Sequence, residues 1–325
     1  MTAEQVSEPQ ASRGWTVAKP SASGVARFAA PLALLAVFVI FYIATPLFLT
    51  VSNITDLLVS AAILLILSMG QQLVVTVAGI DLSVGSNLPW AGAVLAYLVT
   101  HGCPIGWAVL GAIVAGTAVG VVNGFFAAVL GMTDFVVTLG SLSVVSGITL
   151  LLTGGNNVSV SSGFLQGLAL NGAGPVRWFW VVGLVLTLLT GFLLFRTRTG
   201  TYFLATGGNA DAARESGIQV KRIKLLAYVL SGLACGIAAV LFVARNGGSD
   251  PSLQTDLLLS SIAAVVLGGS SLTGGRASVL GSATGAILLQ SLLIGFTLLG
   301  ISQYYQPIAV GIVVLGAAFI SRFQR

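Results

Sequence analysis

The chain contains few charged residues, and this scarcity excludes most classes of soluble protein. Of its 325 residues only 7% are charged and 56% are hydrophobic, and its mean hydropathy is +1.01. A soluble chain of this length carries roughly a quarter charged residues. The formal net charge of +5 says little about nucleic acid, because the basic residues are not interleaved with aromatic residues on a polar face. We expect a membrane protein that binds no nucleic acid.

Cysteine and histidine are also scarce. Cys103 and Cys235 lie in or beside apolar segments far apart in the sequence, which is typical of packing residues and indicates no disulfide framework or metal site. His101, the only histidine, stands at the end of an apolar run. Because no cluster of His, Cys and acidic residues suggests a hydrolase or a metalloenzyme, we expect no catalytic residue, no metal and no enzymatic activity.

The chain has no means of its own to drive transport. None of its lysines, Lys19, Lys221 and Lys224, follows the glycines of a GxxxxGK[ST] phosphate loop, so the chain cannot hydrolyse ATP by itself. No series of intramembrane Asp, Glu or His residues offers a proton relay, which counts against a proton-coupled pump.

Long apolar runs occupy most of the sequence. A membrane-spanning helix needs about 20 apolar residues, and fewer when it is buried in protein. Residues 1–27 are polar and are expected to be a disordered cytoplasmic segment without a signal peptide. We therefore predict an all-α polytopic membrane protein with a transmembrane domain at 28–321. Its ten spans are 28–49, 54–78, 84–101, 105–130, 134–153, 177–195, 223–244, 257–272, 277–300 and 304–320.

The positions of Lys and Arg predict the orientation. With ten spans and both termini in the cytoplasm, only Arg177 and Arg245 lie outside. A bacterial inner membrane is the natural location. Twelve basic residues fall on the inner side, namely Arg13, Lys19, Arg27, Arg196, Arg198, Arg214, Lys221, Arg222, Lys224, Arg276, Arg322 and Arg325.

Ten spans divide into five and five, and a repeat of five must invert across the membrane. The third and eighth spans are among the three shortest, and each abuts a glycine- and serine-rich break, at 79–86 and at 268–275. Short, glycine-interrupted spans at matching positions are typical of the pathway in an inverted-repeat transporter. The alternative is that both breaks are tight loops between tilted helices.

The longest polar interruption, 196–224, has a short helix at its centre. Asn209 can cap its first turn, Asp211 suits the positive end of the helix dipole, and Gly217 can take the left-handed conformation that ends a helix. A helix of about two turns is marginal alone in water. We expect it to insert into a groove on a soluble partner, which indicates a membrane subunit driven by another protein.

Polar residues inside the spans are candidates for a solute pathway. Amide side chains need hydrogen-bond partners in hydrocarbon, and a neutral, hydroxyl-rich solute would use them. Most Ser and Thr residues there bond to their own helix or to a neighbour. For Asp81 we favour capping the third span over contact with solute. The predicted pathway residues are Gln71, Gln72, Asp81, Ser83, Asn87, Asn123 and Gln290.

Five motifs carry a resemblance to a known family. They are AGIDLSVGS (78–86), VVNGFFAAVLGMTDFVVTLGS (121–141), TGG (153–155), TGGNADAARESGIQVKRIK (206–224) and SSIAAVVLGGSSLTGGRASVLGS (260–282). Over about residues 50–320 the chain resembles the permease subunits of ribose-type ATP-binding-cassette sugar importers, which are of type II. Permeases for branched-chain amino acids are more distant members.

The resemblance implies partners and roles. It implies a homodimer or a heterodimer with a related permease, a cytoplasmic ATPase with two fused nucleotide-binding domains, and a periplasmic sugar-binding protein. Because Arg177 and Arg245 are the only basic residues placed outside, we expect them to help dock that protein; the alternative is that they anchor span ends at the membrane interface. The ATPase uses ATP and Mg, and this chain binds no cofactor. The implied coupling residues are Asn209, Asp211, Ala212, Ala213, Arg214, Glu215 and Gly217, where Asp211, Ala212, Ala213 and Gly217 fill the places of the family's Glu-Ala-Ala and glycine.

Two departures affect the expected substrate. Leu257 to Ser260 replace the family's Tyr-Glu-Leu-Asp, and Thr133 and Asp134 stand where prolines are common. The first is compatible with pairing to a different permease. We expect a monosaccharide importer permease; the alternatives are a permease for branched-chain amino acids or a small signalling furanose, and a passive channel or facilitator. The sequence does not name the sugar.

Overall fold

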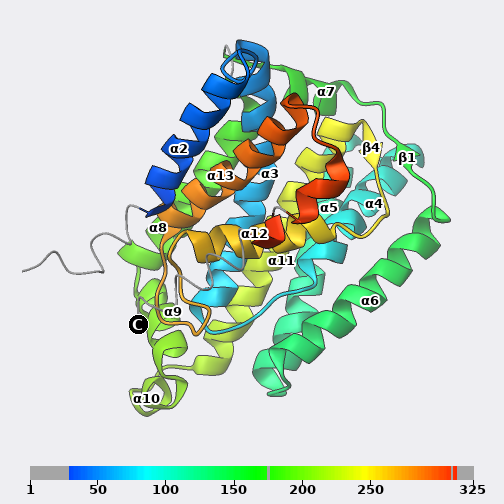
Figure 1. Cartoon of the computed structure of the whole chain (residues 1–325). Coiled ribbons are helices and arrows are strands. Elements are labelled where there is room, and N and C mark those ends of the chain that lie inside the picture. Colours follow the sequence, from blue (N-terminus) through cyan, green and yellow to red (C-terminus); the bar gives the residue numbers. More distant parts are fainter. Residues whose placement is uncertain (1–28, 174–175, 309, 313–325) are drawn as a thin grey trace, which may run out of the picture.

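The structure, a computed structural model, describes residues 29–173, 176–308 and 310–312 (Figure 1). The expected disordered segment 1–27 lies outside the described residues, as do Arg13, Lys19, Arg27, Arg322 and Arg325.

Helices dominate the described chain. The elements in chain order are α2 (Ala29–Ala44), α3 (Val51–Thr76), α4 (Val84–Thr100), α5 (Ile105–Gly124), the π-helix η1 (Phe125–Val129), α6 (Asp134–Thr153), β1 (Val158–Ser159), α7 (Gly163–Leu170), β2 (Gly172–Ala173), β3 (Val176–Arg177), α8 (Trp178–Arg196), α9 (Arg198–Gly208), α10 (Ala210–Glu215), α11 (Val220–Asn246), β4 (Gly248–Ser249), α12 (Thr255–Leu267), α13 (Val279–Leu298) and the 3-10 helix η2 (Gln303–Tyr305).

Six of these segments are long and apolar enough to cross a membrane: α3, α5 with η1, α6, α8, α11 and α13. Each of the first nine expected spans contains a helix, which confirms a polytopic helical protein. Three of those helices, α2, α4 and α12, are shorter than the other six, and 304–320 lies largely outside the described residues. The structure therefore does not confirm the count of ten.

The end of α12 shows why one of these helices is short. The eighth span was expected to reach residue 272, but the helix ends at Leu267. A Cβ added at Gly268 would lie 2.2 Å from the amide nitrogen of Ser282 on α13. Residue 268 is a glycine because α13 passes too close for a side chain, and Gly269 then turns the chain with a φ of +84°.

Helices α3 and α11 form the centre of the fold. Helix α11 packs chiefly against α5 and α3, and α3 also packs against α13 and α8. Small residues bring α5 and α11 together, since a Cβ on Gly120 would lie 2.2 Å from the carbonyl oxygen of Tyr228 and a Cβ on Gly232 would lie 2.5 Å from that of Gly116. Close backbone approach through glycine is typical of helix packing in membranes.

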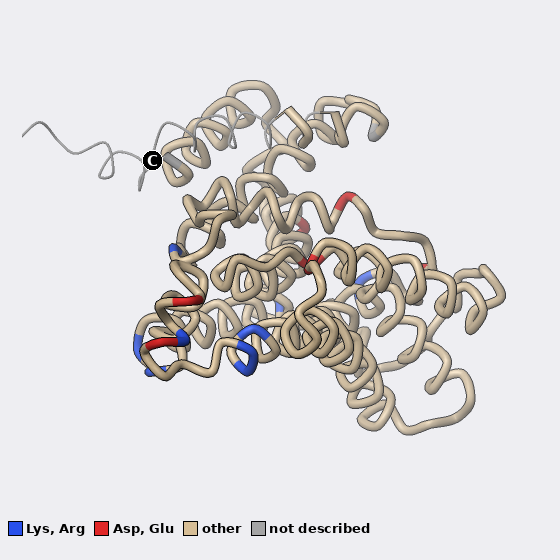
Figure 2. The backbone as a smooth tube through the Cα atoms, turned by 90° about the horizontal axis from the view of Figure 1, so that it is seen from below, with Lys and Arg blue, Asp and Glu red and all other residues tan. Residues whose placement is uncertain are grey.

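The two ends of the molecule differ in structure and in charge. Figure 1 places α9 and α10 at one end and α7, β1 and β4 at the other. The strands pair in two short antiparallel ribbons, β1 with β4 and β2 with β3. Helix α9 was not expected, because its polar sequence lacks an apolar run; its first turn is capped by Thr197, whose hydroxyl accepts the amide of Gly200. Seen from the α9–α10 end, several basic residues gather there (Figure 2).

The two glycine-rich breaks lie against each other. The Gly275 amide donates to the carbonyl oxygen of Thr76, and a Cβ added at Gly274 would lie 2.7 Å from the Cβ of Ala78. Both breaks are therefore at the same end of the molecule, together with the end of α9 at Gly207. One break precedes the third span and the other follows the eighth, and the match of these two spans in an inverted repeat stays a prediction.

Candidate translocation cavity and coupling segment

The loop between α3 and α4 is held by hydrogen bonds from three helices. Its backbone turns at Ala78, which has a positive φ of 58°. The carbonyl oxygen of Ile80 accepts the hydroxyls of Tyr228 on α11 and Thr138 on α6, each at 3.2 Å. The Gln71 side chain on α3 donates to the Asp81 carbonyl oxygen at 2.6 Å. The loop is thus fixed in a shape that its own sequence would not maintain.

The carboxylate of Asp81 is buried and fully engaged. One oxygen accepts the amide of Ser83 at 3.0 Å and its hydroxyl at 2.6 Å, and the other accepts the hydroxyl of Ser231 at 2.8 Å. Helix α4 begins at Val84. Asp81 therefore holds the turn before α4 instead of bonding the amides of its first turn, which corrects the expected capping role.

This carboxylate fixes the orientation of Asn123. The Ser83 hydroxyl gives its only proton to Asp81, so toward Asn123 it can only accept, and the Asn123 Nδ2 donates to it at 2.8 Å. The amide oxygen Oδ1 of Asn123 is then left buried, with no hydrogen-bond partner among the described residues. A buried acceptor without a partner costs about 1–3 kcal/mol, so it is a site for a donor.

Asn123 belongs to the wall of a cavity of about 600 Å³ between α4, α5, η1 and α6. Trp90 contributes an aromatic ring from α4, Phe126 another from η1, and Ser141 a hydroxyl from α6; the remaining lining is aliphatic or glycine. No Asp, Glu, Lys or Arg of the described chain lines it. The volume lies within the range of small-molecule sites, about 300–1,000 Å³.

The structure separates the other predicted pathway residues from this cavity. The Gln72 amide oxygen accepts the hydroxyls of Ser270 at 2.7 Å and Ser282 at 2.6 Å, and Asn87 donates to the carbonyl oxygen of Gly116 at 3.1 Å. Gln71, Gln72, Asn87 and Asn123 are all at most 1% exposed, so they differ in their place relative to the cavity and not in burial. Gln290 is half-buried on α13. Of the predicted set, Asn123 alone is among the residues that line the cavity.

The coupling segment has the expected caps. The Asn209 side chain accepts the amides of Asp211 and Ala212, both at 3.0 Å, and Gly217 has a φ of +82°. Arg214 pairs with Asp211 at 2.7 Å on an exposed face. Ala213 is buried, whereas the coupling residues Asp211, Ala212, Arg214, Glu215 and Gly217 are exposed. Helix α10 thus presents most of its surface outward at one end of the molecule (Figure 1).

The two basic residues expected outside differ from each other. Arg177 is half-buried at the end of β3, and its guanidinium donates to the carbonyl oxygen of Leu170. Arg245 lies at the end of α11 and is exposed. Arg177 closes the α7–β2–β3 segment, which leaves Arg245 as the better candidate for a docking contact.

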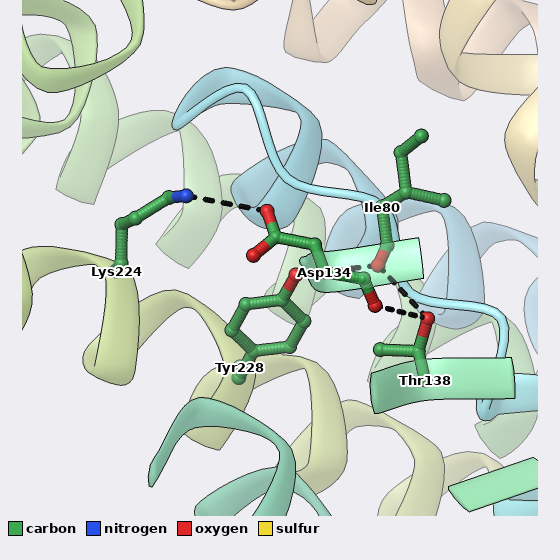
Figure 3. Close-up of polar contacts among 5 residues, drawn as sticks. All are labelled: Ile80, Asp134, Thr138, Lys224 and Tyr228. Atoms are coloured by element: carbon green, nitrogen blue, oxygen red, sulfur yellow. Dashed lines mark hydrogen bonds and ion pairs between the residues drawn. The ribbon is translucent and has the colours of Figure 1, made fainter. Parts of the chain in front are cut away.

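Sequence reasoning missed one ion pair that joins distant segments. Lys224 in α11 contacts Asp134, the first residue of α6, with 3.2 Å between Nζ and Oδ2 (Figure 3). Lys221, one turn earlier, donates to the carbonyl oxygen of Val129 at 3.0 Å. The sequence signal was weak: an acid beside a span and a lysine 90 residues away.

Apolar helices, a cavity without charged residues between α4, α5, η1 and α6, and a capped polar helix at one end are features expected of a polytopic membrane permease. The chain belongs to the family described as "Branched-chain amino acid transport system / permease component", which it matches over residues 53–320. It is a component of a transport system and not an enzyme.

Its relatives are sugar permeases by name. The chain is 37% identical to the ribose import permease protein of Escherichia coli (strain K12), covering 89% of this chain and 91% of that one. It is 34% identical to the L-arabinose ABC transporter permease protein of Azospirillum brasilense (90% and 86%) and 33% identical to the D-allose transport system permease protein of Escherichia coli (strain K12; 85% of each). No solved structure matches the chain.

Proposed function

We propose that the chain is the permease subunit of an ATP-driven importer that carries a monosaccharide across the bacterial inner membrane. Relatives named for ribose, D-allose and L-arabinose each cover at least 85% of the chain, which supports a sugar as the solute. The absence of a phosphate loop in the sequence assigns ATP hydrolysis to a separate subunit.

The observation that carries the choice of solute is the cavity wall at Asn123. Its amide oxygen is an acceptor fixed by Ser83 and Asp81, so it suits a hydroxyl donor. Trp90 offers a large flat surface for the apolar face of a sugar ring. One or two polar contacts among aliphatic residues hold a solute weakly, which favours its release inward.

The cavity also distinguishes a sugar from an amino acid, the solute in the family's description. An amino acid carries an ammonium and a carboxylate group, and each is costly to desolvate without a charged partner. Because no charged residue of the described chain lines the cavity, a neutral solute is favoured. A small signalling furanose is also neutral and rich in hydroxyl groups, so it stays the second candidate.

Asn123→Leu tests the proposal in liposomes that contain the permease with its ATPase and binding protein. We expect monosaccharide uptake to fall roughly tenfold, because a buried acceptor for the solute is removed. Thr117→Val on the same helix is the control, since Thr117 bonds only to the carbonyl oxygen of Ile113 one turn away. Equal uptake by both variants would remove Asn123 from the pathway, and ATP-independent uptake by the unchanged protein would favour a passive channel.

The helix lengths support ten spans in an inverted 5+5 arrangement within a transmembrane domain at 28–321. Among the described helices of each set of five, the second is the longest, with 26 residues in α3 and 27 in α11. The third is short in both, with 17 residues in α4 and 13 in α12. The central helices α3 and α11 also pack against each other, as repeat partners can.

We place the α9–α10 end, with the loop 196–224, in the cytoplasm and both termini on the same side. Seven of the nine basic residues in the described chain lie on segments at this end, from Arg196 to Lys224 and at Arg276. Arg177 and Arg245 lie at the other end, facing the periplasm. This asymmetry agrees with the positive-inside rule.

The exposed helix α10 is proposed as the contact to the ATPase, which binds ATP and Mg. Gly217→Val should reduce ATPase binding and ATP-driven uptake, because a β-branched residue tolerates the φ of +82° poorly. Gly217→Asn is the matched control, since asparagine enters this conformation more readily. Copurification of the ATPase with each variant measures the difference; normal binding by the valine variant would exclude this segment.

The remaining proposed partners are a second permease and a periplasmic sugar-binding protein. The permease pairs as a homodimer or with a related permease as a heterodimer. Arg245, exposed at the periplasmic end, is placed to contact acidic residues of the binding protein.

A further inference from the structure

Helix α10 is rigidly connected to the start of α11. Four residues separate them, and within this turn the Ile218 amide donates to the carbonyl oxygen of Ala213 at 3.0 Å. Ala213 and Val220 are buried, and Ile218 packs against the adjoining apolar cluster. A displacement of α10 therefore carries the first turns of α11 with it.

Two lysines on these first turns reach the same neighbouring segment. Lys221 and Lys224 are three residues apart and so lie on one face of α11. Lys221 binds the Val129 carbonyl oxygen at the end of η1, and Lys224 binds the Asp134 carboxylate at the start of α6. The two contacts bracket the link 130–133, which turns at Gly131 with a φ of +74°.

The ion pair between Lys224 and Asp134 is partly withdrawn from solvent. The side chains are 26% and 13% exposed, against 64% and 85% for Arg214 and Asp211 in the pair on α10. Asp134 also lies at the positive end of the α6 dipole, which favours its charge. The Tyr228 hydroxyl and Thr138, both bonded to Ile80, lie beside the pair (Figure 3). Such a pair stabilises a defined position of α6 more than an exposed pair does.

Helix α6 is the wall of the cavity that is held least by the rest of the chain. It packs chiefly against α4, with smaller contacts to α5 and η1. Its residues Val136, Gly140, Ser141 and Val144 line the cavity opposite Asn123 of α5. A pull on Asp134 would thus move one side of the cavity relative to the other.

We propose that the ion pair between Lys224 and Asp134, supported by the contact of Lys221 with Val129, transmits the movement of α10 to the α6 wall of the cavity. Lys224 and Asp134 are then positioning residues, which set the cavity's shape without contacting the solute. This proposal rests on the proposed function, since it requires that α10 bind the ATPase and that the cavity carry solute. The physical basis of the proposal is a continuous path of contacts from α10 through α11 to the α6 wall of the cavity.

The test compares Lys224→Met, Asp134→Asn and the double charge reversal Lys224→Asp with Asp134→Lys, in liposomes with the ATPase and the binding protein. The measured quantity is sugar imported per ATP hydrolysed. We expect each single variant to lower this ratio about fivefold, within the range of single-residue effects on coupling, while ATP hydrolysis continues. The double reversal should recover at least half of the lost ratio.

Matched controls use charges outside the path. Asp256→Asn changes an exposed acid in the first turn of α12, and Arg276→Met changes an exposed base in the loop before α13. Neither should alter the ratio. An unchanged ratio in both single variants would overturn the proposal, and so would a double reversal that inserts normally but recovers nothing.

A second readout does not depend on which solute is carried. In a background without Cys103 and Cys235, Ser141→Cys on the cavity wall is labelled with a small polar thiol reagent, with and without ATP bound to the ATPase. We expect ATP to change the labelling rate, and we expect this change to be lost in Lys224→Met and regained in the double reversal. If ATP still changes the labelling rate in Lys224→Met, the proposed transmission through the ion pair is contradicted, whichever solute is carried. If the labelling rates follow this expectation but no sugar is taken up, only the sugar assignment is contradicted.

Discussion

The most apolar 18-residue stretches of α3 and α6 have the same mean hydropathy of 2.1, but the two helices differ in how much of their surface the chain itself covers. Of the most apolar stretch of each helix, 94% is buried in α3 and 22% in α6. Their polar residues differ in the same sense. Gln72 on α3 bonds to Ser270 and Ser282, about 200 residues away in sequence, whereas Ser143 on α6 bonds to Leu139 of its own helix.

This difference teaches that hydropathy identifies a membrane helix but not its role. A helix with polar bonds to remote segments is fixed in place by them. When the serines and threonines of a helix bond within one turn, those bonds do not fix the helix relative to its neighbours. In this chain α3 is of the first kind. Helix α6 reaches remote segments only near its start, where Asp134 pairs with Lys224 and Thr138 bonds to Ile80, and its later Ser143, Thr149 and Thr153 bond within the helix.

The largest expected contrast comes from placing a valine on each helix. Gly70→Val on α3 should prevent stable folding or lower the unfolding temperature strongly, because even its Cβ would lie 3.1 Å from that of Ala234 and 3.2 Å from the Cα of Ser231. Gly147→Val on α6 meets nothing within 4 Å. Thermal unfolding of both variants in detergent measures the contrast; similar losses would mean that α6 is also packed in a core.

A smaller contrast is expected from removing one polar group on each helix. Gln72→Leu leaves the hydroxyls of Ser270 and Ser282 without their acceptor, which should cost about 1–3 kcal/mol of stability. Thr149→Val on α6 removes only a bond to Val145 of the same helix and should cost less than 1 kcal/mol. Unfolding in denaturant compares the two, and an equal cost would contradict the view that α3 is held by remote polar bonds.

The mildest contrast concerns accessibility and leaves the fold intact. Cysteines at Gln71, Gln72 and Asn87 should react slowly with small polar thiol reagents, because these positions are at most 1% exposed. A cysteine at Ser141, half-buried in the cavity wall, should react faster. Mass spectrometry measures the labelling rate of each cysteine and compares the three buried positions with Ser141. Fast reaction at Gln71 or Gln72 would return the pathway to the centre of the fold.

Much of the fold could be predicted because an apolar run in the local sequence is enough to identify a membrane helix. The nine described spans begin and end within a few residues of their expected positions, and the caps of α10 were predicted because Asn209 and Gly217 act on neighbours in the sequence. Helix α9 was missed because it is polar and has no apolar run.

The site was harder to predict, since it depends on partners remote in sequence. Gln71, Gln72 and Asn123 have similar side chains in similar apolar surroundings. Only the fold shows that the first two are engaged by Asp81, Ser270 and Ser282, while the amide oxygen of Asn123 is left without a partner. The pair of Asp134 and Lys224 was missed for the same reason, because 90 residues separate its members.

The π-helix η1 sets the length of chain between the two sides of the cavity. It stands at the end of α5, where the Leu130 amide reaches back five residues to the Phe125 carbonyl oxygen at 3.1 Å. A π-turn holds one residue more than an α-turn, and one residue corresponds to about 100° of rotation about a helix axis. The wider turn absorbs its extra residue without that rotation, so deleting a single residue from 125–129 would close it to a regular α-turn and shorten the chain between Asn123 and Asp134 by one residue. The length of this short segment, more than its composition, therefore fixes how much chain joins Asn123 to the ion pair of Asp134 and Lys224.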